Sequence, residues 1–215
     1  MAISYSVFQY VSDSLKDHIS TILDPTITVP TGYENPIDDN ANVALNDIVF
    51  DSPFDMIEGA TNRLSVYLYS IKPNIEQRNN PPEVVYTDAF KTDVKLQRFN
   101  LTMDLYYMIT PFGTSRRNEY AILERIVQIL NINATLSGAM LKGTLPDNNN
   151  TEIRVEPLSL SLDEVNKLWS IFPNKSHKLS LFYQLTPVNV TSAKIAEDLK
   201  TAVDKKIDPK QYKPA

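Results

Sequence analysis

The chain has 215 residues, of which 42% are hydrophobic and 22% charged, proportions that are typical of a globular protein and argue against wholesale disorder. It contains no cysteine and only two histidines, His18 and His177, so disulfides, thiolate nucleophiles, cysteine-ligated zinc and three-histidine metal sites are excluded, and any catalysis would rest on carboxylates. The formal charge of -5 provides no global attraction to nucleic acid or to an anionic membrane.

Several common functional segments are missing from the sequence. No uninterrupted apolar stretch reaches the roughly 18 residues of a membrane-spanning helix, and residues 1–10 lack the basic region of a secretion signal. The five glycines stand far apart, so neither of the common glycine-rich phosphate-binding patterns occurs. We therefore expect a protein made and folded in the cytoplasm, without membrane insertion, nucleic-acid binding or a cofactor.

The first part of the chain predicts one helix and two strands. Residues 4–23 place apolar side chains at the spacing of one helical face, and a proline ends this helix. Residues 26–46 are loop-like except for an extended piece at 27–29, and 47–50 predict a brief strand. Residues 62–71 alternate with apolar side chains on both faces, which predicts a central strand.

A long loop and a long strand are expected next. Residues 72–95 contain Asn79-Asn80-Pro81-Pro82 and little periodicity, which predicts a loop that serves as a contact arm. Residues 98–109 alternate strictly, so one row of side chains is expected to face the core: Phe99, Leu101, Met103, Leu105, Tyr107 and Ile109. The alternate row is expected to face solvent: Asn100, Thr102 and Asp104.

Two further helices are predicted. Thr114 or Ser115 can cap a helix whose apolar stripe is expected to be buried: Tyr120, Leu123, Ile126, Val127 and Leu130. After a turn region at 138–150 and a strand at 151–157, Ser161 and Glu164 form a capping-box pattern. The helix that it opens is expected to bury Leu162, Val165, Leu168, Trp169 and Phe172.

The last strand and the tail complete the expected fold. Residues 178–188 predict a strand with Leu179, Leu181, Tyr183 and Leu185 on one side. The element order favours an α+β or mixed α/β domain over residues 1–190, in which two or three helices pack on one face of a central mixed or antiparallel sheet. Residues 191–215 are expected to form a C-terminal docking arm.

The tail differs from the rest of the chain in charge. Residues 190–215 hold six lysines and four acids, a net charge of +2, whereas residues 1–189 carry -7. Residues 193–206 predict a weak helix with too few apolar side chains to fold alone, so it would order on a neighbouring surface. We therefore expect the following interface residues in the loop and tail: Arg78, Lys194, Ile195, Leu199, Lys200, Val203, Lys205 and Lys206.

Three segments together resemble a known family. They are Leu64-Ser-Val-Tyr-Leu-Tyr69 followed by the loop with Asn79-Asn80-Pro81-Pro82, the strand 101–109 that leads into the helix 119–130, and the segment 158–172, which contains Leu-Trp-Ser, with the strand 179–187. In order and spacing they resemble the N-terminal domain of the cap proteins of bacterial extracellular contractile injection systems. The resemblance covers residues 1–190.

The resemblance implies a structural role and no enzymatic activity. Proteins of this kind are similar to phage tail terminators, so the chain is expected to form a ring of six copies that ends the inner tube and engages the last sheath layer. Its implied partners are other copies of itself and the tube and sheath proteins. It would assemble in the bacterial cytoplasm and then remain part of the particle, whether that particle is retained or released.

Two other functions remain open from the residues. The chain resembles a phage tail completion protein in general, which would join head to tail as an adaptor. A carboxylate-dependent hydrolase would need two acids about 5 to 9.5 Å apart, chosen from Asp88, Asp93, Asp104 and Glu119. The two histidines are expected at the surface or as helix caps rather than in a catalytic site.

Overall fold

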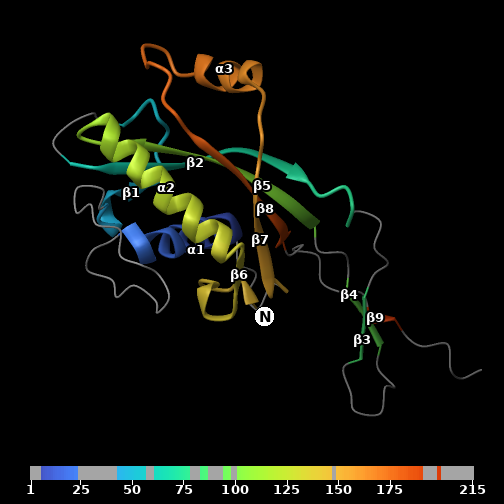
Figure 1. Ribbon diagram of the computed structural model, residues 1–215. Coiled ribbons are helices and arrows are strands. Elements are labelled where there is room, and N and C mark those ends of the chain that lie inside the picture. The colour runs from blue at the N-terminus through green and yellow to red at the C-terminus, as the bar shows by residue number, and fades with distance from the viewer. Residues whose placement is uncertain are drawn as a thin grey trace, which may run out of the picture. The chain divides into compact units, whose positions relative to one another are not determined.

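A six-stranded mixed sheet forms the centre of the first of the two units into which the chain divides (Figure 1). The computed structural model describes residues 6–23, 43–56, 61–77, 83–86, 94–97, 101–146, 149–190 and 198–199. The first unit comprises Met1–Arg78 and Leu101–Thr191, and the second comprises Asn79–Asn100 and Ser192–Ala215. The α+β class predicted from the sequence is confirmed.

The strands of the large sheet follow an order that differs from their order in the chain. Across the sheet they are β1 (Ile48–Val49), β2 (Arg63–Pro73), β5 (Leu101–Phe112), β8 (Leu181–Val190), β7 (Glu152–Pro157) and β6 (Thr135–Ser137). β1 runs parallel to β2, and every other neighbouring pair is antiparallel. The long strands β2, β5 and β8 are therefore adjacent at the centre, as their apolar sequences require.

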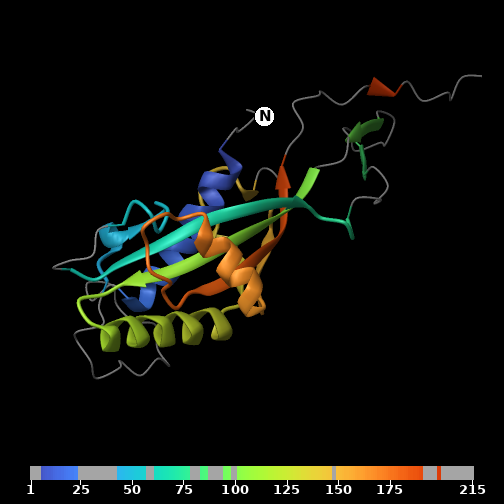
Figure 2. The same ribbon diagram turned by 90° about the horizontal axis from the view of Figure 1, so that it is seen from above.

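The helices cover both faces of this sheet. α1 (Val7–Leu23) and α2 (Arg116–Ile132) pack on one face, whereas α3 (Leu162–Ser170) packs on the other (Figures 1 and 2). Two helices therefore share one face, within the two or three that were predicted, and α3 covers the other face. Neighbouring side chains of a strand point to opposite faces, so β5 contributes Tyr107 to the α1 side and Met108 to the α3 side. An amphipathic helix can pack on either side of such a strand.

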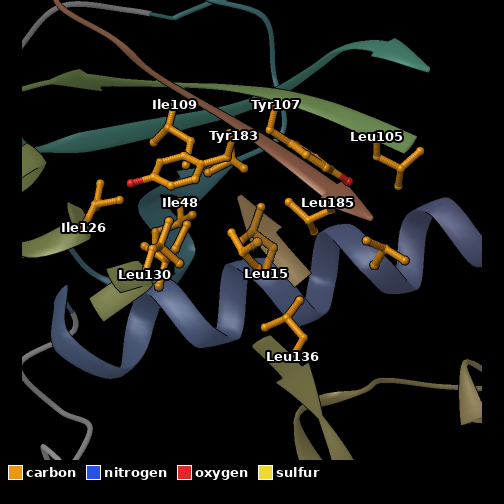
Figure 3. Packing of buried hydrophobic residues seen from close by; sticks show 14 of the residues in the cluster. Leu15, Ile48, Leu105, Tyr107, Ile109, Ile126, Leu130, Leu136, Tyr183 and Leu185 are labelled. Carbon is orange, nitrogen blue, oxygen red and sulfur yellow. The ribbon is translucent and has the colours of Figure 1, made fainter. Parts of the chain in front are cut away.

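The main core lies between the sheet and the first two helices. Leu15, Tyr107 and Leu185 are fully or almost fully buried there, and Figure 3 shows them meeting between α1 and the strands. The Tyr107 hydroxyl lies 2.8 Å from Ser12 Oγ on α1, which satisfies both polar groups inside the core. Burial raises the pKa of Tyr107, although the hydrogen bond to Ser12 opposes the shift.

A smaller core holds α3 against the opposite face. Trp169 and Phe172 are buried against Met108 and Phe182, with ring centroids of Trp169 and Phe172 5.8 Å apart. The predicted capping box at the start of α3 is present: Ser161 Oγ accepts from the Glu164 amide, and the Glu164 carboxylate accepts from the Ser161 amide. Only the C-terminal part of α3 is buried, so Leu162 is 73% exposed against expectation.

Two predictions about β5 were wrong. Thr102 and Asp104 were expected to face solvent, but each is only 8% exposed, because the second face of the sheet is also covered in part. Thr102 Oγ1 donates to Asn189 Oδ1 on the neighbouring strand at 2.9 Å. Conversely, Leu101 at the start of the strand was expected inside and is 56% exposed.

The outer face of α2 is less buried than predicted. Leu123, Ile126 and Leu130 are buried as expected, but Tyr120 and Val127 are exposed. Ile122 and Ile129 take their places in the core.

Two short 3-10 turns flank strands of the large sheet. η2 (Leu45–Asp47) precedes β1, and η3 (Gly138–Met140) follows β6.

The second unit contains a small antiparallel sheet in the order β3 (Glu83–Tyr86), β4 (Val94–Gln97) and β9 (Asp198–Leu199). The stretch 72–95 was predicted to be a loop, but it begins in β2 and contains β3. The predicted tail helix was wrong for its two described residues, Asp198 and Leu199, which pair with β4. The strand gains hydrogen-bond partners for its backbone from β4, whereas a short and weakly apolar helix is not stable alone. The predicted extended piece at 27–29 lies outside the described residues.

His18 makes the stability of this fold sensitive to acid. Its ring is 3% exposed between α1 and the end of α2, with Nε2 3.1 Å from the carbonyl oxygen of Asn133, so it caps α2 but is not at the surface. Burial lowers its pKa, and the hydrogen bond to Asn133 opposes this shift only in part. Below about pH 6.5 the unfolded chain therefore binds a proton that the folded chain takes up only at lower pH.

We predict that the free energy of unfolding falls as the pH drops from 7 to 5, and that His18→Gln reduces this fall. Urea denaturation at both pH values measures the difference. His177, which is exposed, provides the matched control, and His177→Gln should keep the wild-type pH dependence. Equal pH dependence in wild type and His18→Gln would contradict the prediction.

Candidate assembly surfaces

The outermost strands of the large sheet are short. One edge is β1, with two residues, and the other is β6, with three. β1 pairs only with Leu64 and Ser65, so among the described strands the rest of β2, from Val66 to Pro73, has no partner on that side. An unpaired strand edge is a template for further strand pairing, so contacts with other proteins can use this edge as well as the faces of the sheet.

Exposed apolar side chains lie at both ends of α3 and before β8, and an apolar groove lies between α2 and α3. A shallow groove of about 380 Å³ is lined by Val127 of α2, by the segment 157–160 and by the first residues of β8. Leu162, Ile171 and Leu179 are more than half exposed, although Leu162 and Leu179 were predicted to be buried. We call the groove and these exposed residues the α3 shelf. Exposed apolar side chains of this kind are typical of protein contacts.

A second groove, of about 570 Å³, lies on the face of the large sheet that α3 packs on, in the part that α3 does not cover. α3 covers Met108 of β5 and Phe182 of β8. The groove lies over other side chains of the same face of these two strands: Asp104 and Tyr106 of β5, and Gln184 and Thr186 of β8. Charged side chains line it as well: Lys72, Glu76, Arg154 and Glu156. We call it the Asp104 groove.

A buried carboxylate lies at the floor of the Asp104 groove. Asp104 Oδ1 accepts hydrogen bonds from Asn74 Nδ2 at 2.8 Å and from Thr186 Oγ1 at 2.5 Å. All three residues are at least 92% buried, with exposed fractions of 8%, 8% and 4%. Among the described residues no lysine or arginine forms an ion pair with Asp104.

The basic side chains of the groove have other partners. The Arg154 guanidinium lies 3.5 Å from the Glu156 carboxylate. Lys72 Nζ lies over the ring of Tyr106, 4.8 Å from its centroid. Burial, followed by the nearby charge of Asp104, raises the pKa of Tyr106. One sign of this site is visible in the sequence, the polar residues at alternate positions of β5, which were predicted to face solvent.

A buried ion pair ties α2 to the segment before β8. Lys178 Nζ lies 2.6 Å from Glu119 Oε1, and both side chains are less than 10% exposed. The Gly113 amide also donates to Glu119 Oε1, at 3.3 Å. Asp104 lies near the start of β5, whereas Glu119 contacts Gly113, the residue after its end. The nine residues from Asp104 to Gly113 span about 30 Å of strand, so the two acids are far apart. They do not form the pair that a hydrolase would need, and Asp88 and Asp93 lie outside the described residues.

The described residues show no metal site and no membrane-spanning helix. Within the ranges that the structure describes, no three histidine, aspartate or glutamate side chains gather closely enough to hold a metal ion. None of the described helices is long and apolar enough to cross a bilayer.

One of the eight predicted interface residues belongs to a described element. Leu199 is in β9, where its backbone pairs with Val94 of β4. The others lie outside the described residues: Arg78, Lys194, Ile195, Lys200, Val203, Lys205 and Lys206. Their role at an interface stays a prediction.

Comparison with known proteins agrees with this fold. The family model of the Pvc16 N-terminal domain matches residues 7–200. A solved structure of the sheath/tube terminator of the PVC extracellular contractile injection system, in its extended state, superposes with a TM-score of 0.60 at 17% identity, over 94% of this chain and 62% of that one. The tube-terminating cap of the anti-feeding prophage superposes with a TM-score of 0.53 at 14% identity, over 88% of this chain and 56% of that one.

At 17% and 14% identity, the likeness to the two solved structures is one of fold. The chain spans about three fifths of the length of either structure. No curated protein sequence matches it.

Proposed function

The chain belongs to the Pvc16 N-terminal domain family, and from this premise we propose that it is the structural cap of a contractile injection system. In this role six copies form a ring that ends the inner tube and engages the last layer of the sheath. The observation that carries the proposal is the family match over residues 7–200, together with a shared fold over 94% of the chain with a sheath/tube terminator.

The surfaces of the large sheet support a role at the end of a polymer. A terminator needs one face that fits the last subunits and another that offers no site for further growth. The α3 shelf and the Asp104 groove provide faces for specific contacts with those subunits, and such contacts require no catalytic group.

We further propose that the protein acts inside an assembled particle. It would assemble with tube and sheath proteins in the bacterial cytoplasm and remain on the particle afterwards. The two solved relatives come from an extracellular contractile injection system and from the anti-feeding prophage. Repetition of a modest contact around a ring raises its overall strength, so each copy needs only a small interface.

We predict that deletion of residues 192–215 leaves the first unit folded but weakens attachment of the ring to the particle. The deletion removes β9 and most of the predicted interface residues, whereas the cores of the first unit lie within Val7–Val190. Thermal unfolding and the amount of the protein in purified particles measure the two effects. Unfolding of the truncated chain, or undiminished capping by it, would contradict the docking-arm proposal.

One experiment separates the cap from a phage head-to-tail adaptor. Particles purified through a tag on this chain should contain tube and sheath proteins but no capsid protein when analysed by mass spectrometry. An untagged strain controls for nonspecific recovery. Co-purification of capsid protein in an amount comparable to the chain would favour the adaptor and contradict the cap.

A further inference from the structure

We propose that the Asp104 groove of one copy of the chain binds the lysine-rich C-terminal segment, residues 200–215, of a neighbouring copy. The inference rests on the proposed ring and deepens it, because it names the surface on which the arm docks. Its basis is a buried acid without a cationic partner at the floor of an open groove, and a basic segment in the same chain.

The buried acid of the groove forms no ion pair with any described residue, although Lys72 lies opposite it on β2. Within the described ranges, Asp104 accepts hydrogen bonds from the two neutral donors Asn74 and Thr186, although buried carboxylates are usually paired with a cation or coordinate one. Arg154 is paired with Glu156, and Lys72 lies over Tyr106. The open acids of the groove are therefore Asp104 and the exposed Glu76.

A lysine side chain suits this groove better than a metal ion does. Within the described part of the chain, no group of three metal-ligating side chains gathers. Lysine carries its ammonium at the end of a long apolar stem, so the stem can lie against Pro73 and Ile75, which line the groove, while the charge reaches Asp104. The groove runs across the open strands β2, β5, β8 and β7, which leaves room for an extended segment.

The C-terminal segment has the matching charge and sufficient length. Residues 200–215 contain five lysines and two aspartates. Fully extended, they span up to about 50 Å. A tether of this kind in a ring keeps the segment at a high effective concentration near the next copy. The opposite signs of tail and body add long-range attraction.

A labelled peptide tests the docking site without requiring a ring. A fluorescein-labelled peptide of residues 200–215 should bind the full chain in an anisotropy titration, and binding should weaken at high salt. Asp104→Asn and Glu76→Gln should each weaken it about tenfold. Glu124→Gln, which removes the same charge from the exposed face of α2, is the matched control and should leave binding unchanged. Because Glu76 is exposed, its variant remains informative if Asp104→Asn unfolds.

Cysteine pairing tests whether the segment comes from a neighbouring copy. The chain has no cysteine, so one chain can carry Gln184→Cys in the groove and another Lys206→Cys in the tail. A short bis-maleimide should link the mixed chains about tenfold faster than it links Glu124→Cys with Lys206→Cys. Equal rates, or peptide binding that ignores both Asp104→Asn and Glu76→Gln, would overturn the inference.

The mass of the purified protein distinguishes a failure of the proposed ring from a failure of the proposed docking site. Light scattering reports the ring directly. A ring without groove-specific linking and peptide binding contradicts the docking site but leaves the cap intact. A strict monomer that binds the peptide through Asp104 contradicts the ring and supports the groove as the binding site of the segment.

Discussion

Replacement of Lys178 by methionine is expected to lower the free energy of unfolding by about 3–5 kcal/mol. The ammonium of Lys178 is buried 2.6 Å from the Glu119 carboxylate and 5.1 Å from the centroid of the Phe112 ring. Methionine fills a similar volume but removes the close buried cation from the Glu119 carboxylate, which then keeps only Arg116, a longer contact of 3.6 Å from a side chain that is 64% exposed. A buried charge that loses its buried partner keeps most of the penalty of desolvation, which outweighs the gain from a longer apolar side chain.

Two comparison variants make this prediction specific. The double variant Glu119→Gln with Lys178→Met should recover much of the lost stability, because it removes the buried negative charge that Arg116 alone would have to balance. The ion pair Lys167–Asp163 has the same 2.6 Å separation but is about three quarters exposed, so Lys167→Met should change stability little. Urea denaturation followed by circular dichroism measures all three. Equal effects of Lys178→Met and Lys167→Met would show that burial does not decide the strength of these pairs.

Leu15→Ala is expected to destabilise the chain by about 2–5 kcal/mol. Leu15 is completely buried in the main core, and Figure 3 shows it on the side of α1 that faces the sheet, near Leu185. The truncation removes apolar contacts and leaves a cavity that close-packed neighbours on two layers fill only in part. The loss should appear as a lower urea midpoint with an unchanged slope.

Leu162→Ala provides the matched control for this core substitution. It makes the same chemical change in a helix, but Leu162 is 73% exposed, so the effect should stay within about 0.5 kcal/mol. A large loss in Leu162→Ala, or a negligible loss in Leu15→Ala, would contradict the assignment of the core. If Leu162 contacts a neighbouring subunit, its variant should weaken assembly while leaving the isolated chain stable.

Periodicity in the sequence predicted the main elements but not their placement. The helical spacing of Val11, Leu15 and Ile19 and the alternation of Leu105, Tyr107 and Ile109 match the buried core. The face that α3 covers could not be predicted, because β5 and β8 carry apolar side chains on both faces. A stripe on a helix indicates that one side is buried, but it does not say which surface covers it.

The surfaces named in the proposals were the hardest to predict. Asp104 has the position of an outward residue in an alternating strand, and it is buried because Asn74 and Thr186, from the end of β2 and from β8, contact it. Leu162 and Leu179 follow the apolar pattern and yet are exposed. Periodicity does not predict such cases, because burial depends on which elements cover a position in the folded chain.

The tail shows how long-range pairing overrides a weak local preference. Residues 193–206 have helical spacing at only a few apolar positions, and Asp198–Leu199 instead pair with β4, about 100 residues earlier in the chain. A strand pair of this kind depends on a partner that local sequence patterns do not reveal. The charge difference between tail and body, in contrast, is visible in the sequence and supports the docking segment proposed above.

The length of the tubes in a strain that lacks this protein tests the account most directly. Electron microscopy of negatively stained particles from the deletion strain, with a complemented strain as control, gives the distribution of tube lengths. If the chain ends the tube and engages the last sheath layer, the deletion should produce overlong or ragged tubes, and complementation should restore a narrow distribution. Sheathed particles of normal length and shape in the deletion strain would contradict the account.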